Sequence, residues 1–298
     1  MAAGYIGRFA PSPTGPLHIG SLMAAVGSYL EARTHGGRWL LRMEDLDPPR
    51  EVPGAADGIL RDLETLGFQW DGPVVYQSAR LAAYDEALAR LQAAGAVFPC
   101  ACSRSEIADN AVTGIEGPVY PGTCRAGIPA GKTARALRVK VGSIQIQFQD
   151  ALQGPVSQDL AQDIGDFIVR RADGCHAYQL AVAVDDGWQG VTHVVRGADL
   201  LLSTPRQIHI QTLLKLPHPI YMHLPVAVNG AGEKLSKQTH AAPLALSRPT
   251  SALWQALHQL QQSPPQSLLH ASIDDIWSWA SERWQTTAMT GLLSVEIA

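Results

Sequence analysis

Residues 11–20, Pro-Ser-Pro-Thr-Gly-Pro-Leu-His-Ile-Gly, constrain the fold more than any other part of the sequence. Three prolines and a glycine within six residues exclude both a helix and a strand at the start of this segment. The apolar run before it, residues 5–10, predicts a strand, and the apolar residues from about 18 to 35 predict a helix. Residues 38–43 predict a second strand. This order of strand, stiff turn, helix and strand predicts the opening of a parallel nucleotide-binding sheet.

The turn itself has the chemistry of an anion site. A helix that begins directly after a strand and a turn aims its backbone N–H groups and its positive end at whatever lies above the sheet. His18 adds a donor there, and Gly20 has no side chain, so a flat ring can lie close to the backbone. The alternative is a proline-rich loop that contains a histidine by chance.

A second charged segment lies late in the chain. Lys234-Leu-Ser-Lys237-Gln238 follows a loop, residues 229–232, that contains two glycines. Two lysines three residues apart can place two positive charges on one triphosphate. Taken alone, the segment is more typical of a solvated charged turn.

Further elements follow from apolar periodicity. Helices are expected over residues 54–66, 79–94 and 205–216, strands over 136–141, 144–149, 166–171, 177–184, 192–196 and 220–228, and helical structure from about 246 onward. We expect an α/β fold with a Rossmann-like parallel sheet. Its catalytic domain is expected to be split into residues 1–95 and 136–240 by an insertion at 96–135, and followed by a short helical region at 241–298.

The composition limits the class of protein. The chain of 298 residues is 46% hydrophobic, which suffices for a large core. Its net charge of −4 means that a nucleic-acid partner cannot be inferred from bulk charge, so any basic surface must be local. No stretch has the length of a membrane span and residues 1–9 have no apolar signal core, so we expect a cytoplasmic protein.

Three of the four cysteines predict a metal site. Cys100, Cys102 and Cys124 lie close together within the insertion, and three thiolates suit structural zinc. No histidine occurs between positions 35 and 176, so the fourth ligand is not a local imidazole. The candidates from the residues alone are Glu106, Asp109, Glu116 or water. The alternative is three reduced structural cysteines, and Cys175 is expected to be a buried apolar residue.

Together, the segments 11–20 and 234–238 resemble the paired signature motifs of class I aminoacyl-tRNA synthetases. Further segments resemble the glutamyl-tRNA synthetase core, in order, over roughly residues 5–240. They are Arg8-Phe-Ala-Pro-Ser-Pro-Thr-Gly15, Leu41-Arg-Met-Glu-Asp-Leu-Asp47, Tyr76-Gln-Ser78, Asp166-Phe-Ile-Val-Arg-Arg171, Val184-Asp-Asp186, Arg196-Gly197 and Ser203-Thr-Pro-Arg-Gln207. Two positions depart from the general signatures: Ser21 stands where the first motif usually ends in histidine, and Gln238 stands where the second usually ends in serine.

The resemblance implies a site for each substrate. Around glutamate it places Arg8, Ser12, Glu44, Tyr178 and Arg196. Arginines suit the two carboxylates and Glu44 suits the ammonium group, with Arg8 expected on the side-chain carboxylate and Arg196 on the other. His18, Gly20 and Lys237 are expected to bind ATP, which brings magnesium, and His18, Lys234 and Lys237 are expected to promote the reaction. Without the resemblance, Glu44 would be an ordinary ion-pair partner of Arg42, and Tyr178 a core residue.

The resemblance also implies Tyr120 as the fourth zinc ligand and suggests an acceptor for glutamate. Full-length glutamyl-tRNA synthetases carry anticodon-reading domains after the second motif, whereas only residues 239–298 follow it here. The chain therefore resembles the short paralogues that activate glutamate without tRNA and attach it to queuosine in the anticodon of tRNA(Asp). We expect a monomer that binds the anticodon stem-loop. The alternatives are a minimal glutamyl-tRNA synthetase that charges the 3′ end of tRNA(Glu), and a non-catalytic RNA-binding paralogue.

Overall fold

The computed structural model describes residues 4–235 and 242–297. Its first elements are β1 (Ile6–Phe9), α1 (Ile19–Thr34), β2 (Arg38–Met43) and β3 (Val75–Tyr76). The three strands pair in parallel in the order β1-β2-β3. The predicted strand–turn–helix–strand unit is confirmed, because Pro11–Pro16 carries no regular structure and α1 begins directly after His18.

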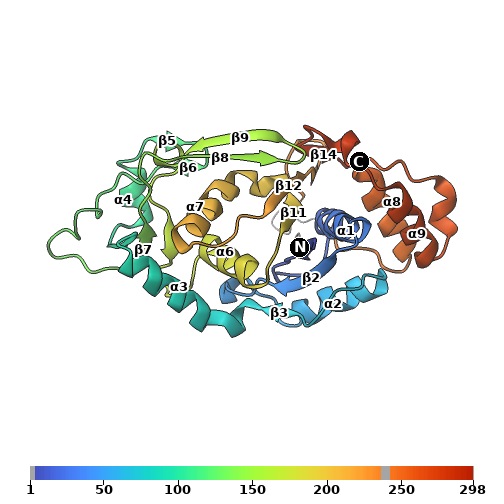
Figure 1. Ribbon diagram of the computed structural model, residues 1–298, viewed down its shortest axis with the longest axis horizontal. Coiled ribbons are helices and arrows are strands. Elements are labelled where there is room, and N and C mark those ends of the chain that lie inside the picture. Colours follow the sequence, from blue (N-terminus) through green and yellow to red (C-terminus); the bar gives the residue numbers. More distant parts are fainter. Residues whose placement is uncertain (1–3, 236–241, 298) are drawn as a thin grey trace.

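A second sheet continues the molecule on the other side of β1 (Figure 1). Its strands run in the order β11 (His193–Gly197), β12 (Ile220–Leu224), β8 (Gln145–Asp150) and β9 (Gly154–Asp159), and only the β8–β9 pair is antiparallel. The backbone N–H of Thr192 donates to the carbonyl of Ile6 at 2.9 Å, which holds the start of β11 beside β1. The carboxyl ends of β1, β2 and β11 therefore face the same region, the usual ligand side of a parallel α/β sheet.

The remaining elements cover and extend these sheets. The helices are α2 (Ala55–Thr65), α3 (Leu81–Ala93), α4 (Arg104–Ala108), α5 (Leu160–Asp163), α6 (Tyr178–Trp188), α7 (Thr204–Leu214), α8 (Pro249–Gln259) and α9 (Ile273–Arg283). Short 3₁₀ turns occupy Pro48–Arg50, Gln77–Arg80, Ala198–Ser203, Gln266–His270 and Thr287–Met289. Across residues 4–235 and 242–297, every helix is too short or too polar to cross a membrane.

The segment rich in cysteine forms its own lobe at the left of Figure 1. It contains α4 and the hairpin of β5 (Thr113–Gly114) and β6 (Gly117–Pro118). Its entry strand β4 (Val97–Cys100) pairs antiparallel with the exit strand β7 (Ala136–Val139), which pairs in turn with β10 (Ile168–Arg170). The lobe has a small core of its own, formed by Phe98, Cys100, Ala101, Tyr120 and Cys124.

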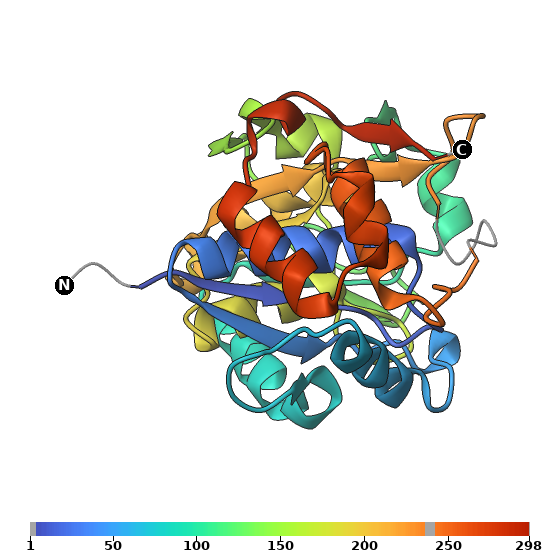
Figure 2. The same ribbon diagram turned by 90° about the vertical axis from the view of Figure 1, so that its right-hand side faces the viewer.

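The C-terminal helices pack back onto α1, the helix of the first sheet. Helices α8 and α9 lie against α1 (Figure 2), and Leu253, Leu257 and Ile276 join the large core built around α1. The strand β14 (Ser294–Glu296) pairs in parallel with β13 (Val226–Val228). Neither β14 nor β9 was expected, since both segments have weak apolar alternation.

Two expectations about secondary structure are wrong. Residues 177–184 were expected to form a strand and instead begin α6. Leu180, Ala181, Val182 and Ala183 are consecutive and all buried, so the helix is apolar on every side and has the same pattern as a buried strand. The strand expected over 220–228 is two strands, β12 and β13, separated at Pro225, which has no N–H to donate to a ladder.

Candidate active site and cysteine cluster

A cavity of about 360 Å³ opens where the carboxyl ends of β1, β2 and β11 meet the starts of α1 and α6. The structure brings together at this cavity all the predicted substrate and ATP residues that it describes. They are Arg8, Ser12, His18, Gly20, Glu44, Tyr178, Arg196 and Lys234. Lys237, also expected here, lies outside the described residues. Residues that are up to 226 positions apart in the sequence thus share one site.

His18 caps the first helix at the mouth of this cavity. Its Nδ1 accepts a hydrogen bond from the backbone N–H of Ser21 at 3.4 Å, and its Nε2 lies 3.1 Å from the Ser21 hydroxyl. Both contacts are satisfied when the proton sits on Nε2. A Cβ atom on Gly20 would lie 3.1 Å from Cε1 of His18 and 3.5 Å from the carbonyl oxygen of Leu235. Gly20 therefore keeps open the space between the first motif and the segment that carries Lys234.

A buried carboxylate positions Arg8 from behind. Asp186, on α6, accepts from Nε of Arg8 at 3.2 Å and from Nη1 of Arg42 at 2.8 Å. Burial opposes ionisation of Asp186, but the two guanidinium groups outweigh it and hold the pKa of this carboxyl below its usual value. Asp186 lies in the segment Val184-Asp-Asp186, to which no role was assigned from the sequence. Its contacts give it one, because they fix the Arg8 side chain at the cavity wall.

Glu44 faces the same cavity beside the two arginines. Arg42 donates to Oε1 of Glu44 at 3.2 Å, so the ion pair considered as an alternative is present. Burial raises the pKa of Glu44 above its usual value despite the nearby Arg42 and Arg8. A carboxylate that is only partly compensated by its neighbours gains most from an additional cation. Tyr178 shares this environment, and burial also raises its pKa.

Arg196 is held by a buried chain of hydrogen bonds through His223 to Asp150, the relay, which was not predicted from the sequence. Nε of Arg196 donates to Nε2 of His223 at 3.1 Å, and Nδ1 of His223 lies 2.6 Å from Oδ2 of Asp150. Thr204 supports the same guanidinium group, since its hydroxyl accepts from Nη2 at 2.7 Å. Asp150, Thr204 and His223 are completely buried. His223 is a polar residue in an otherwise apolar predicted strand, and that was the signal available in the sequence; Asp150 lies just beyond the predicted strand 144–149 and carried no such signal.

The charges of the relay follow from burial. Burial lowers the pKa of His223 to about 4, against the opposing effect of Asp150, so the imidazole is neutral at pH 7. Burial also opposes ionisation of Asp150, but hydrogen bonds from His223, Gln153 and Leu152 keep the pKa of this carboxyl below its usual value. Nδ1–H therefore donates to Asp150 and the lone pair of Nε2 accepts from Arg196. Nη1 of Arg196 is buried and has no hydrogen-bond partner among the described residues.

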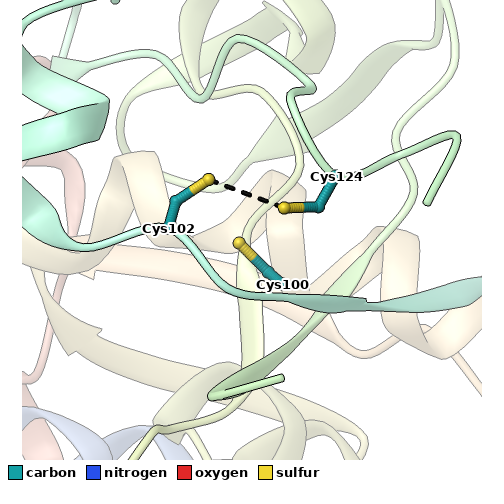
Figure 3. A group of neighbouring side chains, drawn as sticks. All are labelled: Cys100, Cys102 and Cys124. Atoms are coloured by element: carbon teal, nitrogen blue, oxygen red, sulfur yellow. Dashed lines mark hydrogen bonds between the residues drawn. The ribbon is translucent and has the colours of Figure 1, made fainter. Parts of the chain in front are cut away.

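The cysteine cluster lies in the lobe formed by residues 96–135. The Sγ atoms of Cys100, Cys102 and Cys124 all lie within 4.8 Å of one another, with 3.6 Å between those of Cys102 and Cys124 (Figure 3). The phenol oxygen of Tyr120 lies 3.4 Å from Sγ of Cys100 and 3.8 Å from Sγ of Cys102. Three thiols and one phenol around a common centre fit the four ligands of a closed zinc site.

Two of the competing ligands are engaged elsewhere. Glu106 caps α4 and pairs with Lys132, and Glu116 pairs with Arg206. Asp109 is exposed at the end of α4. Cys175, expected to be buried, is partly exposed in the turn after β10, because the polar residues around it keep that turn at the surface.

Arg138 supports the cluster from β7. Its Nε donates to Sγ of Cys100 at 3.3 Å, and its guanidinium carbon lies 3.9 Å from the centre of the Tyr120 ring. Burial opposes ionisation of Cys100, yet hydrogen bonds from Tyr120 and Arg138 lower the pKa of this thiol. Cys100 is therefore suited to hold a thiolate, the form that binds a metal, whereas burial raises the pKa of Cys102.

Comparison with known proteins agrees with this geometry. The family described as tRNA synthetases class I (E and Q), catalytic domain, matches residues 6–247. A glutamate tRNA ligase from Elizabethkingia meningosepticum, solved in complex with its amino acid, superposes with a TM-score of 0.80 at 22% identity, covering 99% of this chain and 67% of that one. The fold is thus that of a class I synthetase catalytic domain, as the resemblance of the two motifs together predicted.

Relatives of nearly equal length identify the family to which the chain belongs within the class I synthetases. The glutamyl-Q tRNA(Asp) synthetase of Dechloromonas aromatica is 60% identical, with 97% of both chains covered. The protein of the same name from Aromatoleum aromaticum is 58% identical, with 98% of this chain and 92% of the relative covered. The chain belongs to the glutamyl-Q tRNA(Asp) synthetase family, within the class I tRNA synthetases.

Proposed function

We propose that this protein activates glutamate with ATP and transfers it to queuosine at the wobble position of tRNA(Asp). The observation that carries the proposal is the charge pattern of the cavity. Two buried arginines, Arg8 and Arg196, and one carboxylate, Glu44, surround a space that Tyr178 and Ser12 complete. Glutamate carries two carboxylates and one ammonium group, so it complements this pattern charge for charge.

Arg196 is the strongest point of the proposed glutamate site. Its buried Nη1 lacks a partner among the described residues, and leaving such a donor unsatisfied is costly. A ligand carboxylate would supply the missing acceptor. Arg8 is assigned to the side-chain carboxylate and Arg196 to the other, and Glu44 to the ammonium group. The raised pKa of Glu44 supports this last assignment, because a bound cation would compensate its burial.

The reaction needs positioning more than proton transfer. The α-carboxylate of glutamate is ionised at pH 7 and attacks the α-phosphorus of ATP, releasing pyrophosphate and forming glutamyl adenylate. His18 at the start of α1 and Lys234, which pairs with Asp199, both line the cavity and are assigned the task of stabilising charge on the phosphates. Lys237 is assigned the same task from the sequence, and Gly20 leaves space for the adenine ring or ribose. Magnesium is expected to arrive with ATP.

The insertion is proposed to hold one structural zinc ion. Cys100, Cys102, Cys124 and Tyr120 would be its ligands, and Arg138 would orient Cys100 and Tyr120. Zinc bound there would fix the lobe 96–135 relative to the two halves of the catalytic domain, 1–95 and 136–240. Residues 241–298 are assigned a supporting role, because α8 and α9 pack on α1.

The acceptor distinguishes the proposal from its alternatives. A minimal glutamyl-tRNA synthetase would use the same adenylate but charge a 3′-terminal ribose. The relatives' names favour queuosine and tRNA(Asp), and the anticodon stem-loop is the part of that tRNA that carries the wobble position. We further propose action as a monomer, and in the cytoplasm, where ATP and tRNA are found.

The activation step can be tested without RNA. ATP–pyrophosphate exchange should proceed with glutamate alone, and aspartate and glutamine should support it poorly. Aspartate is too short to reach both arginines, and glutamine offers a neutral amide to one of them. Exchange that requires tRNA, or that accepts glutamine as well as glutamate, would contradict the proposed site.

A further inference from the structure

A second cavity, of about 560 Å³, lies between the cysteine-rich lobe and the starts of α6 and α7. Its walls are largely apolar and come from Ile107 on α4, from Ile164 and from Phe167. Six polar or charged side chains also line it: Arg104, Tyr120, Arg138, Asp166, Gln179 and Arg206. Arg138 and Asp166 are already engaged, with Cys100 and Arg125 respectively. A cavity of this size with apolar walls and a few polar groups has the usual character of a ligand site.

Two arginines of this cavity can still donate hydrogen bonds. Arg206 pairs with Glu116 and donates to the Ser203 hydroxyl at 3.0 Å, but its Nε is buried without a partner among the described residues. Arg104 is exposed at the start of α4, and no hydrogen bond or ion pair of its guanidinium group is found within residues 4–235 and 242–297. The ligand should therefore be flat and apolar on its faces, with acceptor atoms on its edge or an adjacent anion. An unstacked nucleotide has these properties.

The start of α6 lines both cavities. Tyr178 lines the first cavity and Gln179, the next residue of α6, lines the second. An RNA whose one nucleotide enters the first cavity must bring a covalently linked neighbour close to the second.

We propose that the second cavity binds the unstacked base of the nucleotide next to the one that receives glutamate, with Arg104 and Arg206 on its polar edge or its phosphate. The inference rests on the proposed function, since it takes the acceptor to be a nucleotide within a single-stranded loop. It adds a second RNA contact, which fixes the loop so that the acceptor hydroxyl meets the adenylate. It also assigns a purpose to the lobe 96–135, which forms one wall of the cavity.

Filling the cavity tests the proposal. Ala108→Phe, at the end of α4, would place a ring in the cavity without touching the first site. Ala93→Phe, at the exposed end of α3, is the matched control. Binding of a queuosine-containing anticodon stem-loop, followed by fluorescence anisotropy, should weaken roughly 10-fold in Ala108→Phe, the size expected for one lost stacked base. It should not change in Ala93→Phe, and RNA-free ATP–pyrophosphate exchange should be unchanged in both.

Two further experiments identify the ligand of the second cavity. Stem-loops that lack the base on one side of queuosine should bind wild-type protein as weakly as the intact loop binds Ala108→Phe. Arg104→Gln should reduce the salt dependence of binding by about 0.7 in the slope of log K against log salt, as for one phosphate contact on a single strand. Arg135→Gln, an equal charge change at an exposed position of the same lobe, should not.

The outcomes separate this inference from the proposed function. The second site would be overturned if the stem-loop kept full affinity both without its 5′ flanking base and without its 3′ flanking base. It would also be overturned if Ala108→Phe and Ala93→Phe behaved alike. Both results would count even if glutamate is transferred normally. Loss of binding in Ala108→Phe alone would support the second site, even if the label were found at a nucleotide other than queuosine.

Discussion

Asp150→Asn should weaken glutamate binding although Asp150 does not line the cavity. Oδ1 of Asp150 accepts the backbone N–H groups of Leu152, Gln153 and His223 at 3.0, 2.9 and 3.2 Å. The oxygen of asparagine must keep that position, so its NH₂ group takes the place of Oδ2 and faces Nδ1 of His223. Nδ1 then has to accept, the imidazole proton moves to Nε2, and Nε2–H points at Nε–H of Arg196. The substitution keeps the shape of the three side chains. It reverses the hydrogen bond between residue 150 and His223 and removes the one between His223 and Arg196.

The size of the effect follows from the lost contact. A hydrogen bond that involves a charged group contributes about 1.5–3 kcal/mol. At about 1.4 kcal/mol per factor of ten, KM for glutamate in ATP–pyrophosphate exchange should rise by roughly 10- to 150-fold. KM for ATP should stay within about twofold, because Asp150, His223 and Arg196 form the glutamate end of the proposed site rather than the phosphate end.

Asp159→Asn is the matched control. Asp159 also accepts backbone N–H groups, from Ala161 and Gln162, and has no path to Arg196. Asparagine caps a helix about as well as aspartate, so its exchange kinetics should match the wild type. Circular dichroism would verify that both variants are folded. An Asp150→Asn protein that is folded and keeps its KM for glutamate would refute the relay, and so would an equal rise in KM for ATP.

Four other expectations follow from the same site. Lys237→Ala should slow pyrophosphate exchange by about 10²–10³ with little change in KM for glutamate; an unchanged rate would remove Lys237 from the mechanism. Arg8→Lys should raise KM for glutamate and admit glutamine, since an ammonium group cannot form a forked contact to a carboxylate; continued rejection of glutamine would show that Arg8 does not read the side chain. The purified protein should contain one zinc ion by atomic absorption, and Tyr120→Phe should release it to a chelator at lower chelator concentration; equal retention would exclude Tyr120 as a ligand. The pKa of His223 lies at about 4 in the folded protein, below the ordinary 6.5, so the unfolded chain takes up more protons between these values. The free energy of unfolding should therefore fall by about 2 kcal/mol from pH 7 to pH 5, and urea titrations of His223→Gln should lack this part of the fall.

The sequence predicted the parts of the structure whose signals are local. The prolines of residues 11–16 and the spacing of His18 and Gly20 define the turn and the start of α1 directly, and the structure follows them. The helix α6 was mistaken for a strand because burial on all sides removes the periodicity that distinguishes the two. Its true geometry matters, since a helix there carries Tyr178 at one end and Asp186 near the other.

Contacts between residues far apart in the sequence could not be predicted from local sequence patterns. Asp150 and His223 are 73 positions apart, and only the pairing of β8 with β12 brings them together. Asp186 reaches Arg8 across 178 positions through the packing of α6 beneath β1. The sequence can mark His223 as a polar position within an apolar segment, but its partners depend on the topology of the sheets.

The central claim is that glutamate goes to queuosine, and one comparison tests it most directly. Two synthetic anticodon stem-loops of tRNA(Asp), one with queuosine and one with guanosine at the wobble position, are incubated with the protein, ATP and labelled glutamate. The account predicts label on the queuosine stem-loop only, on the modified nucleoside, with a yield that falls as salt rises because phosphate contacts hold the RNA. Equal labelling of both stem-loops, or label found only at the 3′-terminal ribose of intact tRNA(Glu), would contradict it.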